Sequence, residues 1–116
     1  MSLLTELQAF DADIQDGLTR FVNNAALYEK MLKKFPAAAE DLQVLEYFES
    51  GDLEKALANA HTLKGMTGNL SLSPLYKAYT DIVSLLREEK PEEAKKLLVD
   101  VIPAQKEIIE CIKRYI

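Results

Sequence analysis

The only histidine of this 116-residue chain, His61, stands in the stretch AHTLKGMTGNL, residues 60–70. Lys64 follows it by about one helical turn, and Gly65 and Gly68 come next. A neutral imidazole can act as a nucleophile at neutral pH. A lysine ammonium nearby can stabilise a bound phosphoryl group as a point charge. These residue types at this spacing indicate nucleophilic chemistry on a phosphoryl group.

The same residues also allow a purely structural interpretation. A lone histidine is often a surface or capping residue, and glycines on a helix can serve the close packing of helices. The sequence has no magnesium-binding carboxylate cluster, no phosphate-binding glycine loop and no nucleotide motif, so it does not describe a self-sufficient kinase. If His61 is phosphorylated, the phosphoryl group must come from a partner.

The segment around His61 has the spacing of an amphipathic helix. Gly51 suits the left-handed residue that ends the preceding helix, and Asp52 suits an N-cap. His61 is predicted to share an exposed row with Gly65 and Gly68, because residues three and four apart lie on the same face of a helix. The adjacent row is predicted to face the core; it consists of Leu53, Ala56, Ala60, Leu63, Thr67 and Leu70.

The two glycines on the exposed row are expected to destabilise the helix that contains them. Each costs about 0.5 to 1 kcal/mol relative to alanine inside a helix. Small side chains on an exposed row let the backbone of another protein approach closely and leave a ring nitrogen of His61 accessible. We therefore expect this face to bind a protein partner.

Three further helical segments are predicted from caps and apolar spacing. Asn23 or Asn24 can cap a helix that extends to about residue 45, and Pro36 is expected to kink it or split it in two. Ser73 is predicted as the N-cap of the next helix, with Pro74 at its first position. Pro91 is expected in the first turn of the last helix.

The N-terminal part of the chain is predicted to be less regular. Residues 3–20 are expected to form one or two short helices, broken around residues 11–13. We assign no structural role to the opening residues Met1, Ser2 and Leu3.

These elements predict an all-α fold in a single domain, residues 1–116. Four amphipathic helices joined by short loops favour an antiparallel up-and-down four-helix bundle, with the N-terminal segment covering one end. The single cysteine, Cys111, cannot form an internal disulfide and is expected to be a buried thiol.

Charge and hydropathy restrict the partners. The net charge of -5 disfavours binding to a nucleic-acid backbone. No apolar run approaches the length that spans a bilayer, and we see no secretory signal, so we expect a cytoplasmic protein without membrane contact.

The pattern H-T-L-K-G-x-x-G-N-L, from His61 to Leu70, closely resembles the signature of histidine-containing phosphotransfer (HPt) domains, which act in phosphorelays. Residues 17–21 (GLTRF), 27–35 (LYEKMLKKF) and 50–65 (SGDLEKALANAHTLKG) also resemble the HPt domains of hybrid sensor kinases. One departure is Ser71, where such domains often have glycine.

The resemblance implies a phosphorelay intermediate without kinase activity or a cofactor of its own. His61 would accept a phosphoryl group from the aspartyl phosphate of a response-regulator receiver domain and pass it to a second receiver, and Lys64 would stabilise the group. The magnesium site would lie on the receiver domain. The partners could include receivers within a hybrid histidine kinase. We expect the chain itself to be a monomer. The candidate docking surface comprises Glu54, Ala58, Thr62, Lys64, Gly65, Gly68 and Asn69, whose alternative interpretation is a solvated helix face.

Two other classes of function remain open from the sequence. A helical adaptor or inhibitor could bind a receiver or a kinase without carrying phosphate, although it would not need the pair of His61 and Lys64. A di-iron bundle is less favoured, because such sites use two Glu-x-x-His motifs and this chain has one histidine. We predict no metal site.

Overall fold

The computed structural model describes residues 2–116, and within these residues the chain forms helices and no strands. The prediction of an all-α fold is confirmed. The helices are α1 (Leu3–Gln8), α2 (Ile14–Arg20), α3 (Ala25–Leu32), α4 (Phe35–Leu42), α5 (Val44–Glu49), α6 (Leu53–Asn69), α7 (Ser73–Arg87) and α8 (Pro91–Lys113).

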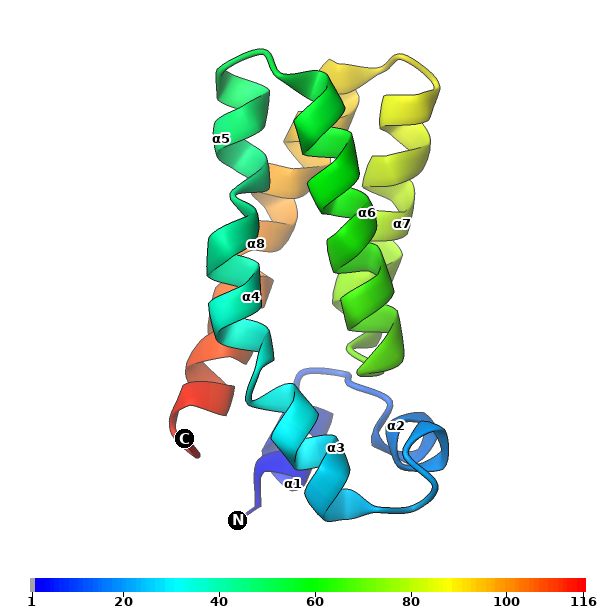
Figure 1. Ribbon diagram of the computed structural model, residues 1–116, viewed down its shortest axis with the longest axis vertical. Coiled ribbons are helices and arrows are strands. Elements are labelled where there is room, and N and C mark those ends of the chain that lie inside the picture. The colour runs from blue at the N-terminus through cyan, green and yellow to red at the C-terminus, as the bar shows by residue number, and fades with distance from the viewer. Residues whose placement is uncertain (1) are drawn as a thin grey trace.

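The longer helices lie side by side and form the body of the molecule. Helices α4 and α5 follow one another in the same direction, and the chain then reverses at each turn into α6, α7 and α8 (Figure 1). Helix α6 packs against α5 and α7, and α8 packs against α7 and against α4 and α5. The resulting shape is elongated, with principal extents of 41 × 24 × 20 Å.

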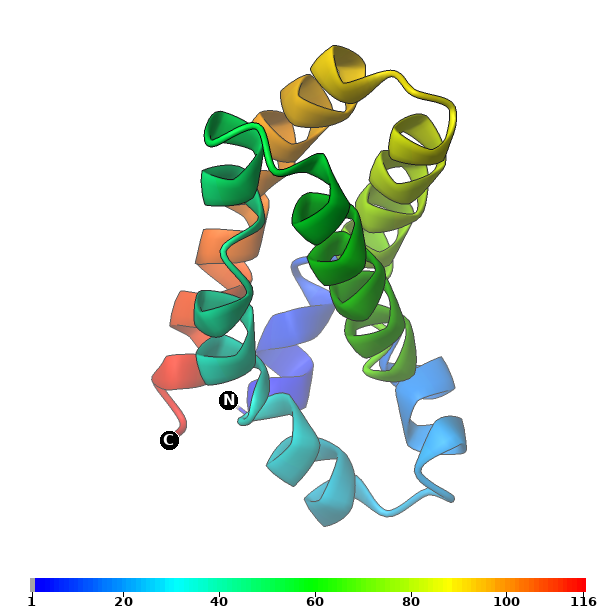
Figure 2. The same cartoon turned by 45° about the horizontal axis from the view of Figure 1, so that its top comes forward.

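Helices α1, α2 and α3 lie across one end of this body, below the C-terminal end of α6 (Figures 1 and 2). The Ser2 hydroxyl accepts a hydrogen bond from the Thr5 amide and caps α1, while the Leu3 side chain is only 2% exposed. Our prediction that the opening residues have no structural role is therefore wrong for Ser2 and Leu3. Met1 lies outside the described residues.

Several predicted caps are confirmed. The Asn24 side chain accepts from the Leu27 amide at 3.0 Å, and the Asp52 side chain accepts from the Lys55 amide at 3.2 Å. Gly51 has a φ of +80°, in the left-handed region that glycine adopts without a steric penalty. Pro91 is the first residue of α8, where its missing amide hydrogen is not needed.

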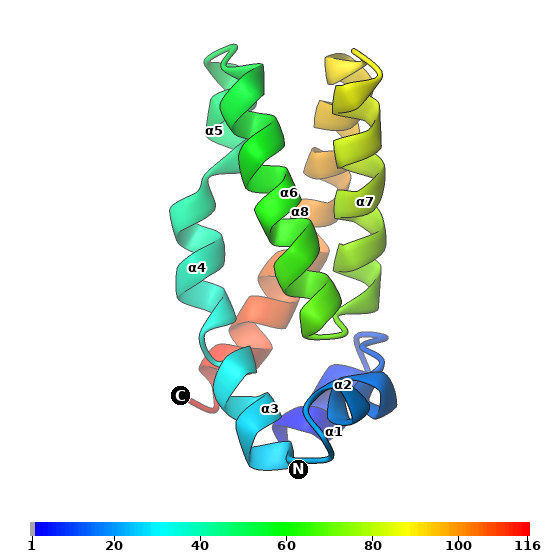
Figure 3. The ribbon, with the colours of Figure 1, turned by 45° about the vertical axis from the view of Figure 1, so that its right-hand side comes forward.

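The helix predicted to follow Asn24 is divided twice, once as expected and once not. The first break comes at residues 33–34, and Pro36 lies in the first turn of α4. The second break, at Gln43, was not predicted (Figure 3). Gln43 is left-handed with a φ of 38°, and the Asn59 side chain donates to the Leu42 carbonyl at 2.6 Å. A side chain from α6 thus satisfies a carbonyl that the α4–α5 break frees from helical pairing.

Two local predictions are corrected by the turn and the helix that follow it. Ser73 is the first residue of α7 and not its N-cap, because the cap position belongs to Leu72, which makes no side-chain capping bond. The turn before it is closed by the Leu72 amide, which donates to the Thr67 carbonyl at 2.9 Å. Leu53, predicted to face the core, is 38% exposed because it starts α6 at the open end of the bundle.

The core extends through the body and into the N-terminal end. Among its largest fully buried side chains are Tyr28, Phe35 and Tyr79, which come from α3, α4 and α7. Cys111 is fully buried, as predicted, and burial raises the pKa of its thiol. The N-terminal helices are therefore part of the packed structure beneath the C-terminal end of α6.

Candidate functional site

Helix α6 presents two different faces. Ala56, Ala60, Leu63 and Thr67 are buried against the neighbouring helices, as predicted. His61 is exposed on the other side of the helix, and Gly65 is exposed one turn further along the same row. The three-four spacing read from the sequence therefore assigns these residues correctly to the core and to the surface.

A surface hollow of about 540 Å³ lies beside His61, and we call it the histidine hollow. It contains five of the predicted site residues: His61, Lys64, Gly65, Gly68 and Asn69. Lys64 is half-buried, and it forms no ion pair within residues 2–116. Its charge is therefore available to an anion bound in the hollow.

The two glycines of this row have different surroundings. A β-carbon placed on Gly65 would meet no atom within 4 Å, so the surface beside His61 is open at this point. A β-carbon on Gly68 would lie 2.9 Å from the ring of Tyr76. Gly68 thus accommodates the Tyr76 side chain from α7, which the sequence did not predict.

Three predicted docking residues lie outside the histidine hollow. Glu54, Ala58 and Thr62 are exposed on α6 but do not line it. The Thr62 hydroxyl donates to the Ala58 carbonyl at 3.1 Å, within the helix itself. Glu54 lines a separate hollow near the start of α6, together with residues of α7 and α8.

Helix α2 and its N-cap add charged residues to the site that were not predicted from the sequence. Asp13, Asp16 and Arg20 line the histidine hollow, and they come from α2 and its N-cap position. Asp16 accepts from Arg20 Nε at 2.7 Å, and its carboxylate also accepts from the Ser71 hydroxyl at 2.6 Å. The Asp13 amide donates to the Ser71 carbonyl at 2.9 Å. Ser71 therefore joins α2 to the end of α6, next to the site.

The charges of this junction stabilise one another. The hydrogen bond from Ser71 and then that from Arg20 lower the pKa of the Asp16 carboxyl, so it stays ionised. The hydrogen bond to Asp16 and the negative charge of the Asp16 carboxylate raise the pKa of the Arg20 guanidinium. An ionised Asp16 orients the Arg20 side chain, which remains half exposed at the edge of the hollow.

The structure also shows what holds Ser71 in place at the position that departs from the sequence pattern. Its φ is 55°, a left-handed conformation that glycine adopts at lower cost. The Ser71 hydroxyl and carbonyl both bond to α2, and these bonds offset part of that cost. The signal in the sequence was the serine at a position where glycine is common, but its partners on α2 could not be read from spacing.

The part of the chain that the structure describes holds no group of three or more His, Cys, Asp or Glu side chains able to bind a metal ion. None of its helices is long and apolar enough to cross a membrane.

Comparison with protein families identifies the class of this all-helical chain with its exposed histidine. The family model described as Hpt domain matches residues 3–114 of the 116 residues. The chain therefore belongs to the Hpt domain family. This family acts in phosphotransfer in two-component signalling; its members carry phosphoryl groups and are not kinases, and in general they interact with receiver domains of response regulators. Neither the curated proteins nor the solved structures gave a match.

Proposed function

We propose that this chain is a phosphorelay intermediate in which His61 is the phosphoacceptor. One observation carries the proposal: the only histidine of an Hpt-family chain is exposed on α6, in a hollow that also contains Lys64. The open surface at Gly65 supports it further, because a protein partner can approach the imidazole there without meeting a side chain.

The proposed transfer takes place between the His61 imidazole and a receiver domain. Nε2 of neutral His61 attacks the phosphorus of a receiver aspartyl phosphate in line, the new N–P bond forms, and the bond from phosphorus to the aspartate oxygen breaks. The aspartate leaves as a carboxylate. In the second step the carboxylate of another receiver aspartate attacks the phosphohistidine, and the imidazole leaves. The chain is a stoichiometric carrier, and the magnesium ion belongs to the receiver.

Lys64 and Arg20 are proposed to act on two different negative charges, that of the transferred group and that of the receiver surface. Both line the histidine hollow, Lys64 from α6 and Arg20 from α2. Lys64 is close to His61 in sequence and on the same helix, so we assign it to the phosphoryl group itself. Arg20, held by Asp16, is assigned to the negatively charged surface that a receiver presents around its own magnesium site.

The docking surface is proposed to extend along α6. Gly65, Gly68 and Asn69 form its part inside the histidine hollow, with Gly68 providing space for Tyr76. Glu54, Ala58 and Thr62 would lie on its outer part; Glu54 is about 10 Å from His61 along the axis, at 1.5 Å per residue. A receiver that contacts both parts would cover much of the exposed row.

We also propose that residues 1–116 act as one domain, a monomer located in the cytoplasm. Its architecture is best described as an up-and-down four-helix bundle, in which α4 and α5 together take the place of one helix. The alternation of direction along α4–α5, α6, α7 and α8 supports this description (Figure 1).

Phosphoryl transfer from a panel of magnesium-loaded, phosphorylated receiver domains tests the proposal. We expect the wild type to acquire an acid-labile, base-stable label and His61→Gln to acquire none. Lys77→Gln serves as the control, because Lys77 is exposed on α7 and does not line the histidine hollow.

A label of equal size on His61→Gln would contradict the assignment of His61. If receivers bind to the wild type and to His61→Gln with equal affinity but no label moves, the chain is an adaptor or inhibitor and not a carrier.

A further inference from the structure

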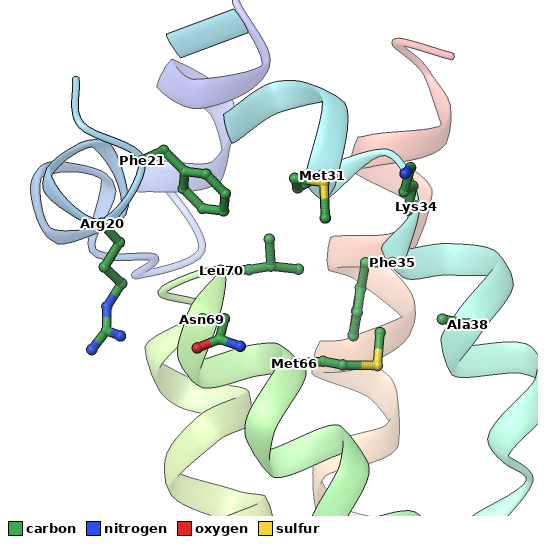
Figure 4. A pocket seen from close by; sticks show the side chains of 9 residues that line it. All are labelled: Arg20, Phe21, Met31, Lys34, Phe35, Ala38, Met66, Asn69 and Leu70. Atoms are coloured by element: carbon green, nitrogen blue, oxygen red, sulfur yellow. The ribbon is translucent and has the colours of Figure 1, made fainter. Parts of the chain in front are cut away.

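A second hollow, of about 620 Å³, lies where the N-terminal helices meet α4 and α6 (Figure 4). Figure 4 shows Met31 and Met66 facing each other across it, with Phe35 beside them and Phe21 and Leu70 at the other side. We call it the methionine hollow. It is a different place from the histidine hollow, although Arg20 and Asn69 lie at the edge of both.

The interior of the methionine hollow is apolar and adaptable. Phe35 and Leu70 are buried, at 0% and 6% exposed, and form a firm base. Phe21, Met31 and Met66 are half-buried and form the walls. Methionine side chains are flexible and polarisable, so they can adjust to apolar ligands of differing shape. A volume of this size lies within the range of small-molecule sites, about 300 to 1,000 Å³.

The charge at the edge of this hollow is positive. The residues that line it include Arg20 and Lys34 but no carboxylate, in a chain whose net charge is -5. Arg20 is already paired with Asp16 at 2.7 Å, and Figure 4 shows its side chain extending away from Met31 and Met66. Lys34 is exposed and has no ion pair within residues 2–116. Lys34 is therefore the cation available to a ligand.

We propose that the methionine hollow binds a small anionic amphiphile, a carboxylate attached to a medium-length hydrocarbon chain. The hydrocarbon lies against Phe35, Met31 and Met66, where its burial removes apolar surface of both molecules from water. The carboxylate remains at the edge, next to the Lys34 ammonium. The site does not depend on phosphoryl chemistry at His61, and its test needs no receiver.

The three methionines of the chain make the binding directly observable. Met31 and Met66 line the hollow, whereas Met1 belongs to the N-terminus. Protein labelled with ¹³C at the methionine methyl groups gives three signals, which Met31→Leu and Met66→Leu assign. Octanoate is the probe, and octan-1-ol is its uncharged analogue. We expect octanoate to shift the signals of Met31 and Met66 saturably.

Variants separate the contribution of charge from that of shape. Lys34→Gln is expected to weaken octanoate about two- to fivefold and to leave octan-1-ol unchanged, as for one exposed ion pair. Lys33→Gln is the matched control, since Lys33 is exposed, adjacent and absent from the hollow. Ala38→Phe places a ring in the hollow and is expected to abolish binding of both probes.

The proposal is overturned if octanoate leaves the Met31 and Met66 signals unchanged, or if it shifts them without saturation. It is also overturned if octan-1-ol binds as tightly as octanoate, or if Lys33→Gln and Lys34→Gln weaken octanoate equally. Shifts caused by a receiver domain but not by octanoate would assign the hollow to a protein interface. If Ala38→Phe fails to fold, the comparison of octanoate binding by Lys33→Gln and Lys34→Gln still tests the proposal.

Discussion

The inward and outward faces of α6 differ in the kind of side chain they carry and in how much a substitution on each should change the stability of the fold. Ala60 and Leu63 are buried and pack against the neighbouring helices, whereas His61 and Gly65, beside them in sequence, are exposed. The inward face contributes the burial of apolar surface that stabilises the fold. The outward face contributes little to packing and contains the proposed chemistry. Stability and phosphotransfer should therefore be separable along one helix.

The largest effect on stability is expected from the inward face. Leu63→Ala should lower the free energy of unfolding by about 2 to 5 kcal/mol, because it removes buried methyl groups and leaves a cavity. His61→Gln should change it by no more than about 0.5 kcal/mol, because the side chain is exposed. Denaturant unfolding of both variants measures the difference. Equal losses of stability in the two variants would show that the inward and outward faces of α6 do not differ in their contribution to the fold.

The end of α6 is held by a buried hydrogen bond whose loss should cost less. The Tyr28 hydroxyl donates to the Leu70 carbonyl at 2.7 Å, and Tyr28→Phe is expected to lower the free energy of unfolding by about 1 to 2 kcal/mol. Unfolding monitored at neutral pH, with the exposed Tyr76→Phe as control, measures this cost.

The same tyrosine should make stability depend on alkaline pH. Burial raises the pKa of Tyr28 to about 12, above the ordinary value of 10.0, so the folded state holds this proton more tightly than the unfolded state. Stability from this group is complete below about pH 10 and is lost as the pH rises toward 12. Tyr28→Phe should show a shallower loss of stability over this interval. The remaining loss is due to groups such as Tyr79, whose pKa is also raised by burial. An unchanged slope would contradict the assignment.

A smaller effect should distinguish the two glycines of the outward face. Gly65→Ala is expected to raise the free energy of unfolding by about 0.5 to 1 kcal/mol, because the new β-carbon meets nothing and the helix loses an entropic penalty. Gly68→Ala should gain less, because its β-carbon would require the Tyr76 ring to move. Thermal unfolding compares the pair. A larger gain at Gly68 would show that the Tyr76 ring does not occupy the space beside it.

The smallest effect is expected at the junction between α2 and the end of α6. Ser71→Ala removes the hydrogen bond that contributes most to lowering the pKa of Asp16, so that pKa should rise toward the ordinary value of 3.8. The stability from this carboxylate is present above the ordinary pKa and is lost as the pH falls through the lowered one. NMR titration of the Asp16 carboxyl in the wild type and the variant measures the shift; identical titrations would contradict the role of Ser71.

Much of the fold could be predicted from the sequence because it depends on local signals. Asn24, Gly51, Asp52 and Pro91 act where capping chemistry places them. The break at Gln43 could not be predicted, since it depends on Asn59 reaching the Leu42 carbonyl from another helix. Long-range contacts of this kind leave no periodic pattern in the sequence.

The candidate site was predictable on α6 alone. His61, Lys64 and Gly65 share one helix, so spacing was enough to place them together. Arg20 and Tyr76 line the same hollow but come from α2 and α7, and only the packing of those helices brings them there. Their residue types carried no signal that distinguished them from ordinary surface residues.

The role of His61 as phosphoacceptor is tested by locating the phosphoryl group on its imidazole. Because the chain has one histidine, protein labelled with ¹⁵N-histidine gives a single pair of ring-nitrogen signals. After transfer from a phosphorylated receiver, the account predicts that the His61 Nε2 signal shifts while Nδ1 remains unsubstituted, and that a second, unphosphorylated receiver reverses the change. A protein that carries the phosphoryl label while both His61 ring signals stay unchanged would contradict the account.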